Sequence, residues 1–383
     1  MKKTAKILIT GYFGMDNLGD DLLFAEALYK LPSKYEIYVN TPPESVIKGE
    51  RVIPSANIEK FRYIRDFHVF TNRWRIFTHR YAGLLYFGGG LFPSRSFSLR
   101  NLLSNMQLGL TCKKRIICGC GIVPKDESRY FQKFLQTVDY CSVRDEISRT
   151  YVEKLGCRAV NCGDLYWGNN NESLDVERKA GTCLICLANP YGENELNNKV
   201  TRQRYNTFLS SLSKVISAIK SAGFVVEYMA FFHLSDEVLI EDLQQLMGTE
   251  DKVLRYGTDY TIESVNSLFA RYDIGFCMRF HSILLSIKNS LPFISINYDY
   301  KSEMLLKEAG LEVYGVRYGI RKAQFFGEEI ELDEQLLLSK FKTMLGDKSL
   351  IKRKSLIFRE KKHRDIKENY NTIFKLLNND CKK

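Results

Sequence analysis

The feature that most constrains the fold of this chain is a regular alternation of short apolar runs with longer runs of helical periodicity. In the first half, the apolar runs cover residues 6–10, 36–40, 83–87, 115–118 and 140–143. In the second half, they cover residues 182–187, 225–229, 274–277 and 293–297. Because strands that alternate with helices pair in parallel, this pattern predicts an α/β architecture built on parallel sheets.

The length of 383 residues predicts two domains, because a single hydrophobic core rarely serves a chain of that size. A polar stretch, residues 169–173, has the composition of a linker between them. We expect two doubly wound domains, residues 1–168 and 178–345, followed by a basic helical tail, residues 346–383. The apolar fraction of 45% and the charged fraction of 26% argue against a disordered or fibrous class.

The net charge of +11 indicates an anionic partner, and most of the excess lies near the end of the sequence. Residues 348–383 contain 12 Lys and Arg residues against 4 Asp and Glu residues. This tail has two interpretations, a binding module or a helix that packs across both domains. In the second case, we expect its apolar contacts to be Leu356, Phe358, Ile373, Phe374 and Leu376.

A second basic stretch, residues 62–80, interleaves five arginines with aromatic side chains. Such a mixture suits nucleic acid, where aromatic rings stack on bases and Arg pairs with phosphate. It equally suits an anionic membrane surface, and the simplest alternative is a solvated helix face with a few core aromatics. Of the two binding interpretations we favour the membrane, and we expect no nucleic-acid partner.

The sequence shows no secretory signal and no apolar segment near the roughly 18 to 20 residues that a spanning helix needs. We therefore expect a cytoplasmic protein, at most peripheral on the inner face of the cell membrane. The ten cysteines lie mainly in apolar runs, which predicts buried thiols and no disulfides. Cys183 and Cys186 have zinc or redox spacing, but such a pair faces opposite ways in a strand, so we favour buried thiols here as well.

The first apolar run is followed by a glycine-rich turn that opens a helix expected at residues 22–31. Gly11, Gly14 and Gly19 allow positive φ angles and a close approach of the backbone to a ligand. Their spacing matches neither the dinucleotide-binding pattern nor a P-loop. Asn17 and Asp20 in this turn can accept hydrogen bonds from sugar hydroxyls, and the alternative makes Asp20 only the helix N-cap.

Two further glycine turns follow the third and fourth apolar runs, at residues 88–90 and 119–121. Ligands of doubly wound domains bind at the carboxyl ends of the strands, which is where these turns fall. Gly89 and Gly90 are therefore candidate binding residues. Together the three turns predict a binding site in the first half of the chain.

Arg144 lies just past the fifth apolar run and ahead of a helical pattern. A structural role would pair it with Asp145 or Glu146, and exposed pairs of that kind contribute little stability. In a crevice at the strand ends, its planar guanidinium would suit a phosphate or a carboxylate. Its position at a strand end favours the second interpretation.

Met278-Arg279-Phe280-His281 lies between the strand-like run at residues 272–277 and a helix expected from Ser282. The N-terminus of a helix attracts anions through its unpaired N–H groups and its dipole. The next strand-like run leads into Lys301. If the intervening helix forms a right-handed crossover, both strands end at the same edge of the sheet. We then expect Arg279, His281 and Lys301 around one pocket.

Taken in order, these motifs resemble the polysaccharide pyruvyl transferase family. The matching segments are Gly11-Tyr12-Phe13-Gly14, Asn17-Leu18-Gly19-Asp20, Gly88-Gly89-Gly90, Gly119-Cys120-Gly121-Ile122-Val123-Pro124, Val143-Arg144-Asp145, Met278-Arg279-Phe280-His281 and Tyr298-Asp299-Tyr300-Lys301. The resemblance implies a GT-B-like fold, two Rossmann-like doubly wound domains facing across a cleft. It also implies transfer of a pyruvyl group from phosphoenolpyruvate to a sugar, with formation of a cyclic ketal.

The resemblance further implies roles for individual residues. The donor-site residues would be His281, Arg279, Arg144 and Lys301, and the donor side would be the C-terminal domain. The substrate-binding residues on the acceptor side would be Gly11, Gly14, Asn17, Gly19, Asp20, Gly89 and Gly90. The acceptor would be a sugar of a cell-surface polysaccharide precursor, which a lipid carrier can present at the inner membrane face.

The chemistry of the residues agrees with these roles. Phosphoenolpyruvate carries a phosphate and a carboxylate, and Arg144, Arg279 and Lys301 supply matching cations. His281 is the natural general acid or base for proton transfer. This scheme demands neither a metal nor a cofactor, so we expect none.

Two alternatives stay open at this stage. A GT-B glycosyltransferase with a nucleotide-sugar donor would also use glycine turns and basic residues in a crevice. A non-enzymatic protein that binds nucleic acid or membrane would instead depend on the basic tail and on residues 62–80.

Overall fold

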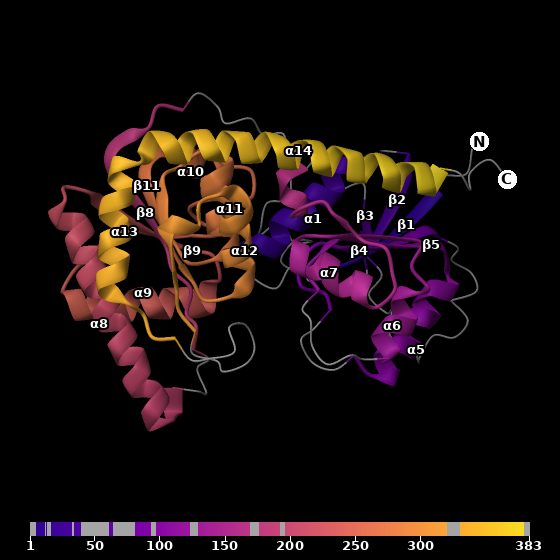
Figure 1. Ribbon diagram of the computed structural model, residues 1–383, viewed down its shortest axis with the longest axis horizontal. Helices are drawn as coiled ribbons and strands as arrows, with labels where there is room; N and C mark the ends of the chain where they lie inside the picture. Colours follow the sequence, from indigo (N-terminus) through magenta and orange to yellow (C-terminus); the bar gives the residue numbers. More distant parts are fainter. Residues whose placement is uncertain are drawn as a thin grey trace. The chain divides into compact units, whose positions relative to one another are not determined.

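The computed structural model describes residues 5–11, 13, 17–32, 34–39, 61–63, 81–92, 97–122, 129–168, 176–191, 196–319 and 330–378. The chain forms two compact units, Met1–Asn170 with Lys361–Lys383, and Asn171–Glu360. Each unit is a parallel sheet covered by helices, which confirms the predicted fold class (Figure 1). Gly14 and most of the basic stretch at residues 62–80 lie outside the described residues.

The first unit contains a seven-stranded sheet with the order β3-β2-β1-β4-β5-β6-β7. Its strands are β1 (Ala5–Thr10), β2 (Tyr35–Val39), β3 (Phe61–Tyr63), β4 (Tyr81–Phe87), β5 (Cys112–Cys120), β6 (Tyr140–Val143) and β7 (Val160–Asn161). Every pair of neighbouring strands is parallel. The strand order reverses between β1 and β4, the position at which doubly wound folds bind ligands.

Helices cover both faces of this sheet. They are α1 (Leu18–Lys30), α5 (Leu99–Leu110), α6 (Arg129–Leu135), α7 (Glu146–Lys154) and the 3₁₀ helix η1 (Leu165–Gly168), joined by the end of α14 (Lys348–Asn378). Leu84 of β4 belongs to the core formed with α5 and α6. A Cβ at the neighbouring Gly83 would instead contact Leu377 of α14. Because successive residues of a strand point to opposite faces, α14 and α5 cover different sides of the sheet (Figure 1).

The second unit contains a six-stranded parallel sheet with the order β10-β9-β8-β11-β12-β13. Its strands are β8 (Lys179–Cys186), β9 (Val225–Ala230), β10 (Val253–Arg255), β11 (Tyr272–Cys277), β12 (Phe293–Asn297) and β13 (Gly315–Arg317). The order reverses between β8 and β11, so this unit has a switch point of the same kind as the first. Strands β11 and β12 pair in parallel, with Cys277 opposite Ser295.

The helices of the second unit fall into two groups. They are α8 (Lys199–Ser221), α9 (His233–Met247), α10 (Val265–Arg271), α11 (Phe280–Lys288), α12 (Tyr300–Ala309), η3 (Glu312–Tyr314) and α13 (Glu334–Gly346). Helix α8 packs against α9 and α13, whereas α11 packs against α10 and α12. Right-handed crossovers on either side of a switch point require this separation onto opposite faces.

The long helix α14 is divided between the two units at Glu360. Within the second unit, Lys348 Nζ lies 2.8 Å from Asp273 Oδ1, and Arg359 donates to the Lys288 carbonyl at 3.1 Å. Within the first unit, the Tyr140 hydroxyl donates to Asn369 Oδ1 at 2.9 Å. Part of the basic charge of the tail therefore serves to attach the helix.

The apolar contacts of α14 differ in part from the prediction. Phe358 and Ile373 are buried as expected, but Leu356 is 40% exposed, so its assignment as a contact was wrong. The buried apolar side chains of the helix are Ile351, Phe358, Ile366, Tyr370, Ile373 and Leu377. Their spacing of three, four, seven or eight residues follows one stripe of the helix, and Leu356 lies off that stripe.

The cysteines of the described residues are mostly buried thiols, as predicted. Cys183, Cys186 and Cys277 are fully or almost fully buried in β8 and β11. Burial raises the pKa of the Cys277 thiol to about 11, so this group is neutral near pH 7. Among the described helices, none is both long and apolar enough to cross a membrane.

Candidate active site

The turn after β1 leads into α1 through an Asn cap. Asn17 Oδ1 accepts a hydrogen bond from the Gly19 N–H at 3.1 Å, and Asn17 Nδ2 donates to Asp20 Oδ2 at 2.7 Å. Asn17 is therefore the N-cap, and the alternative that gave Asp20 this role was wrong. The helix starts at Leu18, four residues before the expected position, because Asn17 already satisfies its first turn.

Asp20 reaches from α1 toward the turn after β4. A Cβ built at Gly89 would lie 3.3 Å from Asp20 Oδ1, so the two residues are neighbours at the switch point between β1 and β4. Gly89 has a φ of 63°, in the left-handed region that favours glycine. Its carbonyl accepts a hydrogen bond from the Gly121 N–H at 2.8 Å. A Cβ at Gly90 would meet no described atom within 4 Å, so that residue borders open space.

Arg144 is held at the carboxyl end of β6. Its backbone N–H donates to the Cys120 carbonyl at 3.1 Å, and its side chain is 6% exposed. A Cβ at Gly121 would lie 2.0 Å from Arg144 Nη2, so the guanidinium packs directly against this glycine. Glycine at position 121 is therefore required for the buried guanidinium to lie there.

The neighbouring carboxylate of Arg144 is Asp145, with a distance of 3.5 Å between Nε and Oδ2. Asp145 is also the N-cap of α7, where Oδ1 accepts from the Ser148 N–H at 2.8 Å. The predicted pairing thus exists, but both side chains are buried rather than exposed. A buried pair of this kind costs desolvation energy, so its net contribution to stability is small.

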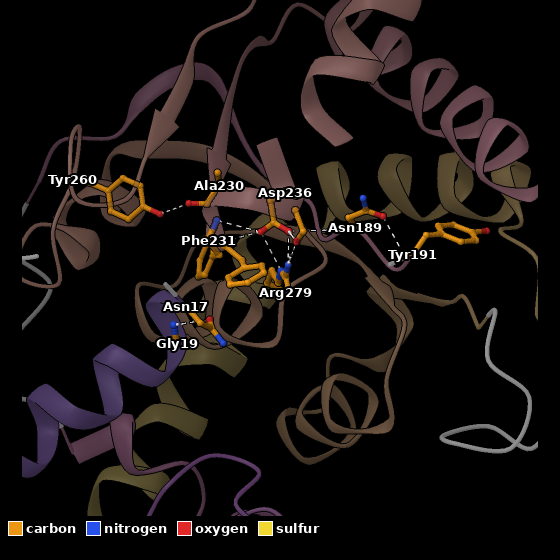
Figure 2. A network of polar contacts seen from close by, with 11 residues as sticks. Asn17, Gly19, Asn189, Tyr191, Ala230, Phe231, Asp236, Tyr260 and Arg279 are labelled. Atoms are coloured by element: carbon orange, nitrogen blue, oxygen red, sulfur yellow. Dashed lines mark hydrogen bonds and ion pairs between the residues drawn. The ribbon is translucent and has the colours of Figure 1, made fainter. Parts of the chain in front are cut away.

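In the second unit, Arg279 occupies the N-cap position of α11, directly after β11. Its guanidinium forms an ion pair with Asp236 on α9, in which Nε lies 3.1 Å from Oδ2 and Nη2 contacts Oδ1 (Figure 2). The Nη2 atom also lies 3.3 Å from the Ser235 hydroxyl. The guanidinium lies over the Phe232 ring, 5.9 Å from its centroid. Contacts on several sides therefore fix the orientation of Arg279.

Asp236 is the centre of this network and is 0% exposed. Its carboxylate accepts backbone hydrogen bonds from Phe232 at 3.0 Å, from Phe231 at 3.3 Å and from Asn189 at 3.4 Å. These donors follow the carboxyl ends of β8 and β9, and Arg279 follows β11, so one carboxylate joins the ends of three neighbouring strands (Figure 2). The Tyr260 hydroxyl holds the end of β9 through a 2.5 Å hydrogen bond to the Ala230 carbonyl.

Asp236 was not among the residues predicted from the sequence. One feature of the sequence could have indicated it: an acidic residue in the first turn of the helix after β9 lies at the same sheet edge as Arg279. Acidic residues are common in the first turn of helices for reasons of the helix dipole alone. Only the ion pair with Arg279 separates this Asp from those ordinary cases.

The partners of Arg279 keep its guanidinium protonated. Burial by itself would lower the pKa of the guanidinium, but Asp236 and the hydroxyl of Tyr298 outweigh that effect, and its pKa is raised above the ordinary value. Burial also raises the pKa of Tyr298, against the opposing influence of Arg279. The site therefore holds a charged arginine beside a neutral phenol near pH 7.

Lys301 has a carboxylate partner as well. Its Nζ lies 3.2 Å from Asp299 Oδ2, and Asp299 caps α12 by accepting from the Ser302 N–H at 2.9 Å. Burial would raise the pKa of Asp299, but Lys301 and the Ser302 N–H outweigh it, so its pKa is lowered. Each of the three predicted cations thus has an adjacent carboxylate, which makes these groups preorganised pairs rather than bare charges.

His281 lies in the first turn of α11, two residues after Arg279. Its ring meets the ring of Phe280 edge-on, with centroids 5.1 Å apart. Lys301 follows β12, the parallel neighbour of β11. The prediction that these residues follow strands ending at one edge of the sheet is therefore confirmed by the strand pairing.

The remaining predicted residues, Asn17, Gly19, Asp20, Gly89, Gly90 and Arg144, belong to the first unit, together with Gly11. They follow the carboxyl ends of β1, β4 and β6 in that sheet. Within the described part of the chain, no group of three or more His, Cys, Asp or Glu residues is placed to hold a metal ion.

Comparison with solved structures places this fold in the GT-B class. UDP-GlcNAc 2-epimerase from Neisseria meningitidis, bound to UDP-GlcNAc, matches with a TM-score of 0.60 and 11% identity over 97% of this chain and 100% of that one. A glycosyltransferase from Rickettsia africae matches with a TM-score of 0.58 and 9% identity over 98% of both chains. At such identities the likeness concerns the fold alone.

A mutant of the O-GlcNAc transferase of Thermobaculum terrenum matches with a TM-score of 0.51 and 10% identity over 100% of this chain and 69% of that one. No curated protein matches this chain. A model of the family described as polysaccharide pyruvyl transferase matches residues 17–300. The chain therefore belongs to the polysaccharide pyruvyl transferase family and is a transferase.

Proposed function

We propose that this enzyme transfers the pyruvyl group of phosphoenolpyruvate onto two hydroxyls of one sugar, forming a ketal and releasing phosphate. The observation that carries the proposal is the Arg279–Asp236 pair at the start of α11, with His281 in the first turn of the same helix, inside the region that matches the family. A fixed arginine at a helix N-terminus suits the phosphate or the carboxylate of such a donor. Lys301, after the adjacent strand, would supply a second cation.

The reaction balances with these groups and no redox partner. One sugar hydroxyl attacks C2 of the donor while its C3 methylene accepts a proton and becomes a methyl group. The C2–O bond to phosphate then breaks, and the second hydroxyl attacks C2 and closes the ring. Of the two hydroxyl protons, one replaces the proton given to C3 and the other leaves with phosphate. His281 is the side chain that we assign to this proton transfer.

The first unit would bind the acceptor sugar. Asn17 and Asp20 present polar side chains beside the glycine turn at Gly89, where sugar hydroxyls can donate and accept hydrogen bonds. Arg144 would recognise an anionic group from the end of β6. The acceptor class that we infer is a precursor of a cell-surface polysaccharide, such as a capsule or an exopolysaccharide, carried on lipid at the inner membrane face.

The direct test is incubation of the protein with phosphoenolpyruvate and candidate lipid-linked or nucleotide-linked sugars. Mass spectrometry should show the gain of one pyruvyl ketal together with release of inorganic phosphate. The competing function, a glycosyltransferase with a nucleotide-sugar donor, would instead show transfer of a hexose and release of nucleotide. That product with no ketal would overturn the proposal.

Variants of two residues test the assignment of roles. His281→Ala should abolish transfer and leave binding of phosphoenolpyruvate largely unchanged, because the ring moves protons rather than holds the donor. Arg279→Ala should weaken donor binding instead. Isothermal calorimetry with phosphoenolpyruvate separates these effects from turnover, and wild-type turnover in either variant would contradict the assignment.

A further inference from the structure

Helix α5 carries a stripe of exposed apolar side chains. Leu99, Leu103, Met106 and Leu110 follow one another at intervals of four, three and four residues, which places them on one face. The four residues are 48%, 52%, 43% and 78% exposed. Single exposed leucines are ordinary, but a continuous row of them on one helix indicates an interaction surface.

The stripe is not needed for packing within the first unit. The core-facing side of α5 is supplied by Leu102 and Leu108, which are 5% and 7% exposed. They belong to the core cluster that includes Phe131 and Phe134 of α6. Helix α5 is therefore anchored by one apolar face and presents a second apolar face outward.

Exposed cations lie near both ends of the stripe. Helix α5 contains no Asp or Glu residue. Arg100 is exposed in its first turn, and Lys113 is exposed three residues past Leu110. The next residue, Lys114, forms an ion pair with Asp139 at 3.1 Å. Arg100 and Lys113 thus place exposed cations close in sequence to the first and last residues of the apolar row.

We propose that this surface, defined as the stripe with Arg100 and Lys113, docks the protein on an anionic lipid membrane. An amphipathic helix of this kind lies in the plane of the interface, with apolar side chains among the acyl chains and cations at the headgroups. Anionic headgroups attract each Lys or Arg close to the surface. Twelve residues give a contact about 18 Å long.

A second copy of this chain is the less suitable occupant. Parallel pairing of two α5 helices would bring the exposed Arg100 of one copy close to Arg100 of the other, and the helix itself contains no carboxylate. Stable interfaces bury about 1,200 to 2,000 Å² in total, more than one pair of helices this short would provide. An anionic surface removes both objections.

This inference is independent of the proposed transfer reaction, because it depends on the surface of α5 and on no catalytic residue. It also concerns a different segment from residues 62–80, for which the sequence suggested a membrane contact. A lipid-bound enzyme would meet a lipid-carried acceptor directly. Loss of membrane binding and loss of ketal formation can be measured separately, so one can fail without the other.

The experiment is sedimentation of the full-length protein with vesicles of phosphatidylcholine that contain about one third phosphatidylglycerol. The first variant, Leu103→Gln with Met106→Gln, interrupts the stripe, and its matched control is Leu246→Gln on α9, a residue that is 55% exposed. The second variant, Arg100→Glu with Lys113→Glu, reverses the charges, and its control is Lys342→Glu, exposed on α13.

We expect wild type and both controls to bind the anionic vesicles, and each α5 variant to bind at least about tenfold more weakly. Wild-type binding should also weaken with added salt and with vesicles of phosphatidylcholine alone. Unfolding midpoints should stay near wild type, because all substituted side chains are exposed. Absence of wild-type binding, or equal binding by the α5 variants, would overturn the proposal. A wild-type dimer that the stripe variant converts to monomer would overturn it in favour of self-association.

Discussion

Replacing Asp236 by alanine tests whether this buried carboxylate is what fixes Arg279. The change removes the ion pair at the start of α11 and takes the acceptor away from backbone N–H groups after β8 and β9. Arg279 would then be a charge at a partly buried position with its main partner gone. We therefore expect losses of both stability and donor affinity.

The expected magnitude follows from the burial of the two partners. Breaking a buried pair by removing one member costs about 3 to 5 kcal/mol. Arg279 is 20% exposed and can regain some water, so we take the lower end, about 3 kcal/mol. The Phe231 N–H, from a residue that is 1% exposed, loses its acceptor at a cost of about 1 kcal/mol. The total is about 4 kcal/mol of unfolding free energy.

Urea unfolding of Asp236→Ala measures this loss, and Glu241→Gln on the exposed side of α9 is the control, with an expected change within about 0.5 kcal/mol. The double variant Asp236→Ala with Arg279→Met should recover about 1 to 2 kcal/mol relative to Asp236→Ala, because no unpaired charge remains. In a phosphate-release assay, Asp236→Ala should raise the KM for phosphoenolpyruvate at least about tenfold. A loss below about 1 kcal/mol, or additive losses in the double variant, would refute the reasoning.

Two further predictions concern the other paired cations. Gly121→Ala should destabilise the protein by about 2 to 3 kcal/mol in urea unfolding, because the new Cβ would lie 2.0 Å from Arg144 Nη2. The control, Gly90→Ala, should have little effect because Gly90 borders open space. Equal effects of the two substitutions would contradict this account. Asp299→Asn keeps a good N-cap for α12 but removes the charge beside Lys301. Because the folded pKa of Asp299 is lowered, its contribution is present above the ordinary pKa of about 3.9 and is lost as the pH falls through the folded value. Urea midpoints should therefore differ between wild type and this variant at pH 7, and the difference should shrink as the pH falls below the ordinary pKa of about 3.9. A difference that does not depend on pH would argue against the Lys301 contact as its source.

The apolar pattern of the sequence predicts the inner strands of both sheets but not their edge strands. All nine predicted strands occur, and the described strands that the prediction missed are β3, β7, β10 and β13, the edge strands of the two sheets. Inner strands pair on both sides and are covered on both faces, so they read as continuous apolar runs. The missed strands have two or three residues each, too short for any periodicity. Their pairing depends on a neighbouring strand that local sequence does not show.

The residues of the candidate site likewise comprise some that the local sequence predicts and some that it does not. Position after a strand end was enough to single out Arg144, Arg279, His281 and Lys301, because parallel strands bring their carboxyl ends to one edge. Their partners were harder to find. Asp236 lies 43 residues before Arg279 in the sequence, and nothing in its local pattern distinguishes it from an ordinary acid in a first helical turn.

The sequence by itself determined the α/β class, the family and the residues at the strand ends, since these follow from periodicity and from local motifs. Only the tertiary structure decided that each predicted cation has a carboxylate beside it and that α5 presents a second apolar face to solvent. Both depend on contacts between distant segments. Pairing and exposure are properties of the packed chain, because an apolar or charged residue has the same local signature whether a neighbour covers it or not.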